Sequence, residues 1–514
     1  MLVGPGVVAA VKVDVALAGT ALLLWGWWLR RLGRPHLHRR RRDAILATLG
    51  LLGILCWGNL LQFRPGFVHG GDVFHYYFGA KYFHELGYTR LYRCMAVADS
   101  EDGFGERARM RQLRDLETDR IVSSDAILAR PLDCTERFST ARWAMFKRDV
   151  GWFRGRTDPA LWERISLQYG YNATPVWGAA GAVLTNASPA SWTQIALLVA
   201  LDPLLLAGMW AAVWWAFGWR AMCVALIYWG TNFPARFAWA GGCFLREDWL
   251  VLSIVGLCLL RRGYPGAAGA SLGWAACLRI YPAWLLGGVA LKVVARMLTG
   301  RSMRLSRGLR RLAFGSALAV AILVPLGAAG AGGWQAWKGF NDNIIKHAST
   351  PVTNRMGLAT LAAYDHEHRA RLIKNFPGLS WEDARRQAFA RRRVLFIAAV
   401  CVFTVMLGWS VRDQQDWAAA ILGVGLIAVV GEATCYYYSI MLAYGLVGDR
   451  REGIAAALCA LSAAGGVVGM LVDQNDEVYA LLSAVTLAFI LGATVALGRH
   501  PIEKPEYEGI RADR

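Results

Sequence analysis

Long apolar blocks almost free of charge are the feature that most constrains how this chain of 514 residues can fold. Three of them are AWLLGGVALKVV, VLFIAAVCVFTVMLGW and AAAILGVGLIAVVG, and the stretches between the blocks are rich in arginine. Hydrophobic residues make up 56% of the sequence and charged residues 18%, whereas soluble domains have about a quarter charged. Because a helix needs roughly 20 mostly apolar residues to cross a bilayer, the pattern predicts an all-α, polytopic integral membrane protein. It excludes soluble, fibrous and disordered classes.

The net charge of +19 comes mostly from short loops beside the apolar blocks. Residues 30–43 read RRLGRPHLHRRRRD, and residues 292–311 carry seven basic side chains and no acid. Short basic loops mark the cytoplasmic side of a membrane protein, so the first helix should run inward to residues 30–43. No aromatic-interleaved recognition module accompanies the charge, which argues against nucleic-acid binding. We expect a multi-pass protein of a bacterial inner membrane.

The polarity profile divides the chain into six regions. They are N-terminal transmembrane helices at 1–62, a polar loop at 63–172, a central transmembrane region at 173–333, a second polar loop at 334–393, C-terminal transmembrane helices at 394–498 and a cytoplasmic tail at 499–514. About 11–13 membrane helices are expected. The alternation of loop charge places both long polar loops on the outer, periplasmic side, where they should form one cap. Loops of this length are usually functional.

Local signals refine this division. The apolar piece at 174–185 is short enough to be re-entrant or interfacial, and Arg279-Ile-Tyr-Pro282 should divide the segment 266–292 into two half-helices that line a cavity. In the first polar loop, EDGFGERARMRQLRDLETDR shows helical i,i+4 charge pairing. Cys94 and Cys134 lie in the same loop and could form a disulfide if it faces an oxidising compartment.

Asp72 is the first candidate for chemistry. It follows a Gly70-Gly71 break, and Asp72, His75, Tyr76 and Gly79 share one face of the helix that the break should begin. An acid on an aromatic-rich helix at the bilayer surface suits a general base that faces a cavity. Spacing alone favours the alternative that Asp72 is an N-terminal helix cap.

Several segments together resemble glycosyltransferase family 87, a family of GT-C membrane enzymes that includes polyprenyl-phosphate-mannose-dependent mannosyltransferases. The first outer-loop signature of that family is matched by Asp72, Tyr76-Tyr77, Ala80, Gly87 and Leu91-Tyr92. Further similarities are Tyr171-Asn-Ala-Thr-Pro175, the stretch LVLSIVGLCLLRRGYPGAAGASLGWAACLRIYPAWLL with Arg279 and Pro282 at its break, and Lys346-His347 with Asn354. The helix at 1–30 and the polar insertion at about 95–165 depart from the family pattern, as does Arg246-Glu247-Asp248, which replaces the Gly-Gln the family often has.

The resemblance implies an inverting transfer of a sugar, with mannose as one candidate, from a polyprenyl-phosphate donor to a lipid or glycan acceptor at the periplasmic face. The base would be Asp72, and arginine suits the phosphate because its planar fork pairs with two oxygens. The candidates for holding the donor phosphate are Arg279, Arg236, Arg246 and His347. The candidates for acceptor binding or cavity lining are His75, Tyr76, Asn172, Glu247, Asp248 and Asn354. Membrane lipids are expected partners, no metal ligand is assigned, and a divalent cation stays open as a cofactor.

Three further features leave alternatives open. Glu247 and Asp248 could be a second acidic site, a metal site with Asp72, or ordinary acids in the first turn of a helix. The run Tyr436-Tyr437-Tyr438 fits an interfacial aromatic belt better than a sugar platform. Glu432, within apolar sequence, needs a partner. The rival function is a secondary transporter, which also places charges and broken helices near the midplane of the bilayer, although the sequence has no internal repeat.

Overall fold

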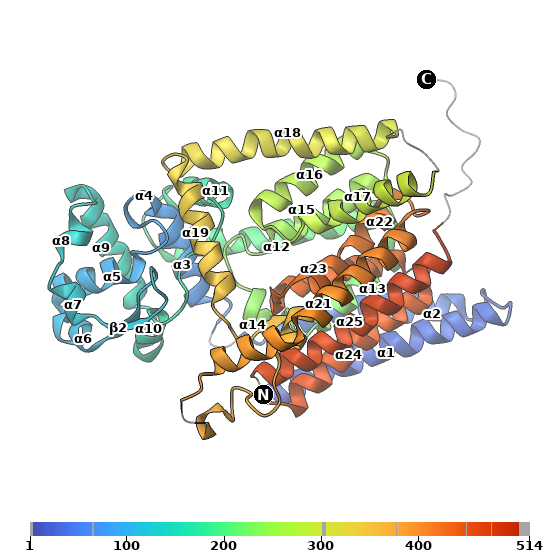
Figure 1. Cartoon of the computed structure of the whole chain (residues 1–514), viewed down its shortest axis with the longest axis horizontal. Helices are drawn as coiled ribbons and strands as arrows, with labels where there is room; N and C mark the ends of the chain where they lie inside the picture. Colours follow the sequence, from blue (N-terminus) through green and yellow to red (C-terminus); the bar gives the residue numbers. More distant parts are fainter. Residues whose placement is uncertain are drawn as a thin grey trace.

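Six helices of the computed structural model are long and apolar enough to cross a membrane. The structure describes residues 4–63, 66–300, 305–376, 378–448, 450–473 and 475–502, so most of the expected tail at 499–514 lies outside the described residues. The six helices are α1 (Pro5–Arg31), α12 (Trp192–Phe217), α18 (Arg307–Gly330), α21 (Trp381–Val411), α24 (Glu452–Leu471) and α25 (Asp476–Arg499) (Figure 1). The protein is mostly helical with a membrane-embedded part, as the apolar blocks predicted.

Other apolar segments form shorter or more charged helices. These are α2 (Arg39–Trp57), η1 (Asn59–Leu61), α11 (Pro175–Thr185), α13 (Trp219–Thr231), α14 (Phe237–Ala240), α15 (Asp248–Arg261), α16 (Pro265–Leu278), α17 (Ala283–Leu298), α22 (Asp416–Gly423), α23 (Gly425–Val430) and the 3-10 segment η4 (Cys435–Val447). The expected count of 11–13 spans includes several of them and stays a prediction. The predicted break is confirmed, because α16 ends just before Arg279 and α17 begins just after Pro282.

Small residues allow α16 and α18 to pack closely. A Cβ atom at Gly269 would lie 2.0 Å from the carbonyl oxygen of Leu312, and one at Gly315 would lie 2.0 Å from that of Gly266. Close backbone approach at glycine is the usual way membrane helices gain packing contacts, since lipid supplies no hydrophobic driving force between them. The outward faces of these helices are apolar and exposed: Phe314 of α18 has an exposed fraction of 68%.

The first polar region folds into a compact unit at one end of the molecule, drawn at the left in Figure 1. Its elements are α3 (Gly70–Lys81), α4 (Phe83–Leu86), α5 (Leu91–Asp99), η2 (Ser100–Phe104), α6 (Gly105–Met110), β1 (Gln112–Arg114), β2 (Ile121–Ser123), α7 (Asp125–Leu128), α8 (Leu132–Thr135), α9 (Thr140–Arg154) and α10 (Pro159–Ile165). A buried acid connects α9 to α3: Asp149 accepts hydrogen bonds from Tyr77 and Tyr82 and forms an ion pair with Lys81 at 2.8 Å.

The charge pairing of residues 101–120 predicted a helix, and this is only partly right. Helix α6 ends at Met110, after which β1 pairs with β2 in an antiparallel hairpin. Asp115 explains the change, because its carboxylate accepts hydrogen bonds from the backbone N–H of Glu117 and from the Thr118 hydroxyl. Such local bonds offer the backbone a turn in place of a helix.

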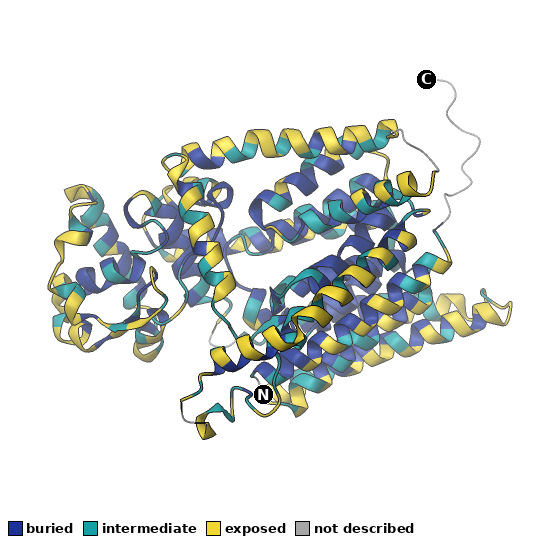
Figure 2. Ribbon diagram, in the orientation of Figure 1, coloured by how far each residue is buried: buried dark blue, intermediate teal, exposed yellow. Residues whose placement is uncertain are grey.

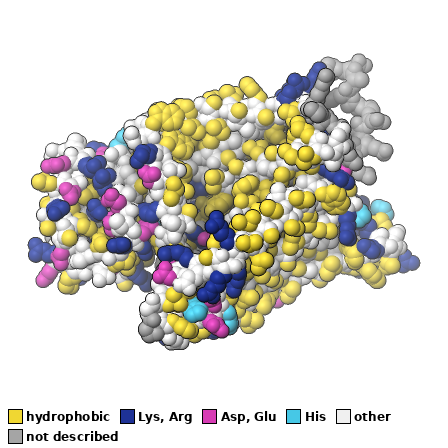
Figure 3. Space-filling view, viewed as in Figure 1, with side chains coloured by type: hydrophobic (Ala, Val, Ile, Leu, Met, Phe, Trp, Pro, Cys, Tyr) yellow, Lys and Arg dark blue, Asp and Glu magenta, His cyan; other side chains and the backbone are white. Residues whose placement is uncertain are grey.

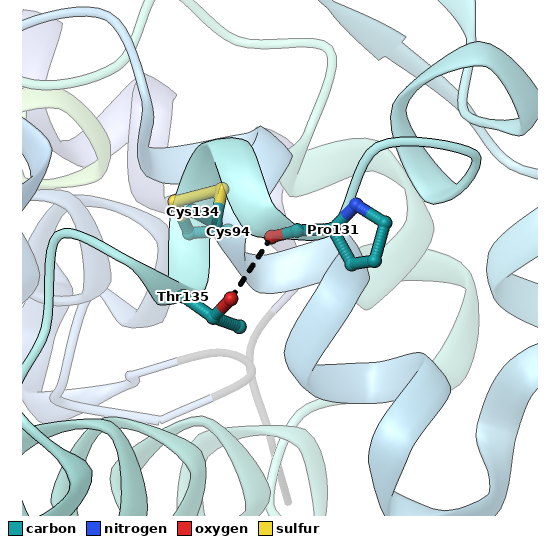
Figure 4. Close-up of a disulfide and its surroundings, with 4 residues drawn as sticks. All are labelled: Cys94, Pro131, Cys134 and Thr135. Atoms are coloured by element: carbon teal, nitrogen blue, oxygen red, sulfur yellow. Dashed lines mark hydrogen bonds between the residues drawn. A yellow bond between two sulfur atoms is a disulfide. The ribbon is translucent and has the colours of Figure 1, made fainter.

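Cys94 and Cys134 form a disulfide in this unit (Figure 4). It joins α5 to α8, whose first turn is shown beside it with the hydrogen bond from Thr135 to the carbonyl oxygen of Pro131. The two cysteines are 40 residues apart in the sequence. A cross-link of that span stabilises the fold mainly by restricting the unfolded chain.

The second polar region contacts the first. It comprises α19 (Gln335–Ser349), β3 (Arg355–Met356), α20 (Leu358–Ala363), η3 (Ile373–Asn375) and the start of α21, and β3 pairs with β4 (Ala433–Thr434). Lys346 of α19 lies 3.6 Å from Asp119, and Asn343 donates to the carbonyl oxygen of Tyr171. The two polar regions therefore lie at the same end of the molecule, as predicted. The expected boundary at residue 393 falls inside α21, which continues without a break from Trp381.

The surface divides in the same way. Figure 2 shows exposed residues along the outer sides of α18 and α21, and Figure 3 shows that this side of the helical part is largely apolar. The compact polar unit carries both signs of charge, whereas Lys and Arg gather at the opposite end. An apolar band between two charged ends is the surface of a protein that lies in a bilayer.

Candidate functional site

Asp72 lies in the first turn of α3 but does not cap it. The cap is His69, whose Nδ1 accepts the backbone N–H of Asp72 at 3.1 Å. The Asp72 carboxylate is directed instead to Arg246, whose Nη1 donates to Oδ1 at 2.8 Å. Its second oxygen, Oδ2, is buried and has no hydrogen-bond partner at normal distance among the described residues, and the buried thiol of Cys243 lies beside the carboxylate. One oxygen of the carboxylate is thus held, and the other is available to a ligand.

Arg246 is fixed from behind by Asp202, a buried acid of α12. Asp202 accepts the backbone N–H of Arg246 at 2.8 Å and that of Glu247 at 3.3 Å. Sequence analysis did not select Asp202, although an acid inside an apolar helix and directly before Pro203 is a usable signal. The loop before α15 is therefore anchored to the membrane part at the position from which Arg246 reaches Asp72.

The ring of Tyr76 joins two arginines. The guanidinium carbons of Arg246 and Arg279 each lie 5.9 Å from its centroid, and Arg246 lies 4.2 Å from the ring of Tyr436. Nη1 of Arg279 donates to the carbonyl oxygen of Leu278 at 3.0 Å, whereas the buried Nη2 has no partner among the described residues. Tyr436 thus belongs to this cluster, contrary to the interfacial-belt interpretation of the tyrosine run.

Tyr76 is itself held by the segment before α11. Its hydroxyl donates to Oδ1 of Asn172 at 2.7 Å, and its ring packs edge-on against Tyr171 and Trp177. Burial raises the pKa of Tyr76 to about 12, so the hydroxyl remains protonated and keeps this bond at neutral pH. The side chain of Tyr76 therefore lies between Asn172 and the two arginines.

Glu247 and Asp248 lie at the start of α15, where acids in a first turn are stabilised by the helix dipole. Asp248 interacts electrostatically with Arg279. Burial raises the pKa of Glu247 to about 8, against the opposing effect of Arg246, and its Oε2 has no partner in the described part of the chain. No group of three or more His, Cys, Asp or Glu able to hold a metal ion occurs among the described residues.

Four predicted site residues lie elsewhere. His75 is 4% exposed and bonded at 2.6 Å to the Tyr92 hydroxyl, because its position on α3 faces the core of the polar unit. His347 contacts the ring of Tyr169 where the two polar regions meet. Asn354 is engaged through its backbone, whose carbonyl oxygen accepts the N–H of Cys435. Arg236 lines a separate cavity between α1 and α13.

Glu432 has the partners that its apolar surroundings required. Its two oxygens accept hydrogen bonds from Arg355 at 2.8 Å and from Arg385 at 2.9 Å. The Thr360 hydroxyl adds a third bond at 3.1 Å. These contacts attach the second polar region to the chain four residues before Tyr436, so they position the tyrosine run and do not involve Asp72, Arg246 or Arg279.

Comparisons with protein-family models, with curated proteins and with solved structures find no match for this chain. What the Asp72 cluster can do follows from its own geometry. It combines a carboxylate that has one free oxygen with two buried guanidinium groups that have free N–H donors. Buried charged atoms without partners are rare in folded proteins and call for a ligand or solvent to satisfy them. The cluster is suited to bind an anion such as a phosphate group and to accept a proton beside it.

Proposed function

We propose that the protein is an inverting membrane glycosyltransferase of the GT-C type, similar to family 87. It transfers a sugar from a polyprenyl-phosphate donor to a lipid or glycan acceptor. The observation that carries the proposal is the Asp72–Arg246 pair beside Arg279, with Oδ2 of the acid and Nη2 of Arg279 both lacking hydrogen-bond partners among the described residues. This arrangement supplies a base and cationic phosphate ligands in one cluster.

The reaction assigns each group a step. The acceptor hydroxyl oxygen attacks the anomeric carbon of the donor while Oδ2 of Asp72 takes the hydroxyl proton. The bond from that carbon to the phosphate oxygen breaks, and the polyprenyl phosphate leaves with the electron pair. Arg246 keeps Oδ1 engaged, which orients Oδ2. A base of this kind contributes typically 10²- to 10⁴-fold to a rate, provided that it reaches the proton.

Arg279 and Arg246 would hold the leaving phosphate. A guanidinium donates through a planar fork that matches two phosphate oxygens, and its charge balances the one that develops on the leaving group. Their burial strengthens the interaction, since few water molecules screen it. Tyr76 and Tyr436 lie against these arginines and help to hold their guanidinium groups in place.

Two observations favour a periplasmic site. The polar unit that carries Asp72 holds a disulfide, which persists in oxidising compartments and is rare in the cytosol. The basic loop at 30–43 lies at the other end of α1, where the positive-inside rule places the cytoplasm. The cap formed by the two polar regions then covers the outer face of the membrane.

The test is transfer of a radiolabelled sugar. Purified protein is incubated with polyprenyl-phosphate mannose, or another polyprenyl-phosphate sugar, and an extract of membrane lipids and glycans. We expect a labelled product that depends on both donor and acceptor. A secondary transporter instead moves an intact solute across sealed proteoliposomes. Solute uptake without a new labelled glycoside from any donor would contradict the proposal and support the transporter.

A further inference from the structure

A cationic cavity lies at the end of the N-terminal helices that is opposite to the basic loop at 30–43. Its volume is about 290 Å³, and it lies between α1, the end of α2, the end of α13 and α24. Its polar lining consists of Lys12, Asn59, Gln62, Thr231, Asn232 and Arg236. Among the described residues its lining holds two cations and three amides and no carboxylate. Such a lining attracts an anion, because Lys12 forms no ion pair with a described carboxylate.

Lys12 is the unusual member of the lining. It lies seven residues into α1, about 10 Å along a membrane-length helix whose only other charged residue before Arg30 is Asp14. Its ammonium donates to Oδ1 of Asn59 at 2.7 Å, and no described carboxylate forms an ion pair with it. A lysine in a membrane helix is costly unless it has a partner or a functional ligand. Two of its three N–H donors remain available to the cavity.

Asn232 gives an independent sign of a ligand. The residue is 4% exposed, and its buried Nδ2 donates to no described residue. A buried amide that lines a polar cavity and lacks an acceptor is satisfied when an oxygen-bearing ligand enters. The guanidinium of Arg236 lies on the same side, 4.6 Å from the ring of Phe233.

We propose that this cavity binds the phosphate group of an anionic phospholipid from the outer leaflet. Lys12, Asn232 and Arg236 would donate to the phosphate oxygens. The apolar part of the lining, Pro5, Val8, Ala9 and Phe233, gives the glycerol and the first carbons of the acyl chains a surface along α1. The site is separate from the Asp72 cluster and does not depend on the proposed transferase activity. It also gives a role to the N-terminal helix that the family resemblance does not include.

The first experiment measures lipid affinity by native mass spectrometry of the detergent-purified full chain. Phosphatidylglycerol is the probe, and phosphatidylethanolamine, which is zwitterionic, is the comparison lipid. We expect preferential binding of phosphatidylglycerol. Lys12→Gln should weaken it by roughly 10- to 150-fold, the range for loss of one charge-assisted bond. The matched control is Lys338→Gln on α19, an exposed lysine that should leave affinity unchanged. Unchanged affinity in Lys12→Gln overturns the proposal.

A second variant keeps the test decisive if Lys12→Gln does not fold. Asn232→Asp preserves the shape of the side chain and places a tethered carboxylate between the two cations. We expect it to raise the thermal stability of the lipid-free protein and to abolish stabilisation by phosphatidylglycerol. Wild-type lipid binding in Asn232→Asp overturns the proposal. Inorganic phosphate is added in a parallel arm, and binding of phosphate without any preference for phosphatidylglycerol would show that the cavity takes the free ion and not the lipid.

Discussion

Nη1 of Arg246 donates to Oδ1 of Asp72 at 2.8 Å, although 174 residues separate the two in the sequence. The pair joins the first helix of the polar unit to the loop before α15. Because Asp202 holds the backbone of Arg246, the position of the carboxylate is set by the membrane part as well as by α3. This explains how a side chain on the polar unit can keep a fixed place relative to Arg279.

Asp72→Asn is expected to fold and to lower turnover by roughly 10²- to 10⁴-fold, because the amide keeps the shape but cannot accept the proton. Helix capping cannot account for such a loss, since the cap is His69. The measurement is the rate of labelled product formation at saturating donor, together with the thermal unfolding midpoint. Near-normal turnover in folded Asp72→Asn would exclude Asp72 as the base and make Glu247 and Asp248 the next acids to test.

A matched control separates catalysis from loss of an ion pair. Asp119 lies 3.6 Å from Lys346 in the contact between the two polar regions, and Asn tolerates the positive φ of 59° that Asp119 adopts. Asp119→Asn should therefore reduce stability slightly and leave turnover within a few-fold of wild type. A loss of turnover equal to that of Asp72→Asn would mean that both variants act by loosening the cap.

The sequence could indicate Asp72 and Arg279 because each interrupts a local pattern, Asp72 at a glycine break and Arg279 as a charge in apolar sequence. Tyr76 was indicated by sharing a helix face with Asp72, and Arg246 as an arginine suited to phosphate. It could not show that Asp72 and Arg246 are paired, since a contact across 174 residues leaves no local signal. The position of Tyr436 was missed for the same reason. A run of tyrosines has the same sequence pattern whether its side chains face lipid or an arginine.

Arg279→Ala is expected to weaken binding of the polyprenyl-phosphate donor more than binding of the acceptor. Loss of one charge-assisted phosphate contact costs on the order of 1.5–3 kcal/mol, or roughly 10- to 150-fold in affinity. Arg279→Lys should recover only part of this, because an ammonium lacks the planar fork. Donor titration by quenching of tryptophan fluorescence measures the effect. Arg262→Ala, an exposed arginine at the far end of α15, is the control. Wild-type donor affinity with a reduced protein yield would make Arg279 structural.

The membrane orientation predicts opposite labelling of two introduced cysteines. Met110→Cys lies on the polar unit, where Met110 has an exposed fraction of 79%, and Arg310→Cys lies at the basic end of α18. An impermeant thiol reagent applied to cells with a permeable outer membrane should label position 110 and not position 310. The reverse result would place the polar unit in the cytoplasm, and with it the disulfide and the Asp72 cluster.

The fold shows which sequence signals are dependable. Long apolar blocks located the six helices that are long and apolar enough to cross a membrane, because a bilayer accepts few alternatives to a helix. The polar regions were less predictable. Charge pairs four residues apart fit a helix at 101–120, yet the side chain of Asp115 turns the chain into a hairpin. The predicted boundary at residue 393 was set by the change from polar to apolar sequence. Helix α21 continues through this change, since arginines are good helix formers.

Acid should destabilise the polar unit through His75. Burial lowers the pKa of this imidazole to about 4, whereas the unfolded chain binds the proton near pH 6.5. Between these values the unfolded state holds more protons, so the free energy of unfolding decreases as the pH falls from 6.5 to 4, by about 3 kcal/mol in all from this residue. His75→Gln keeps a hydrogen-bonding group for Tyr92 but does not titrate, and should flatten this decrease. His36→Gln, at an exposed site, is the control. The measurement is the thermal unfolding midpoint of each variant between pH 6.5 and 4. If the midpoint of His75→Gln falls with pH as steeply as that of wild type, the destabilisation comes from other groups. His347 is then the first candidate, because burial lowers its pKa to about 4 as well.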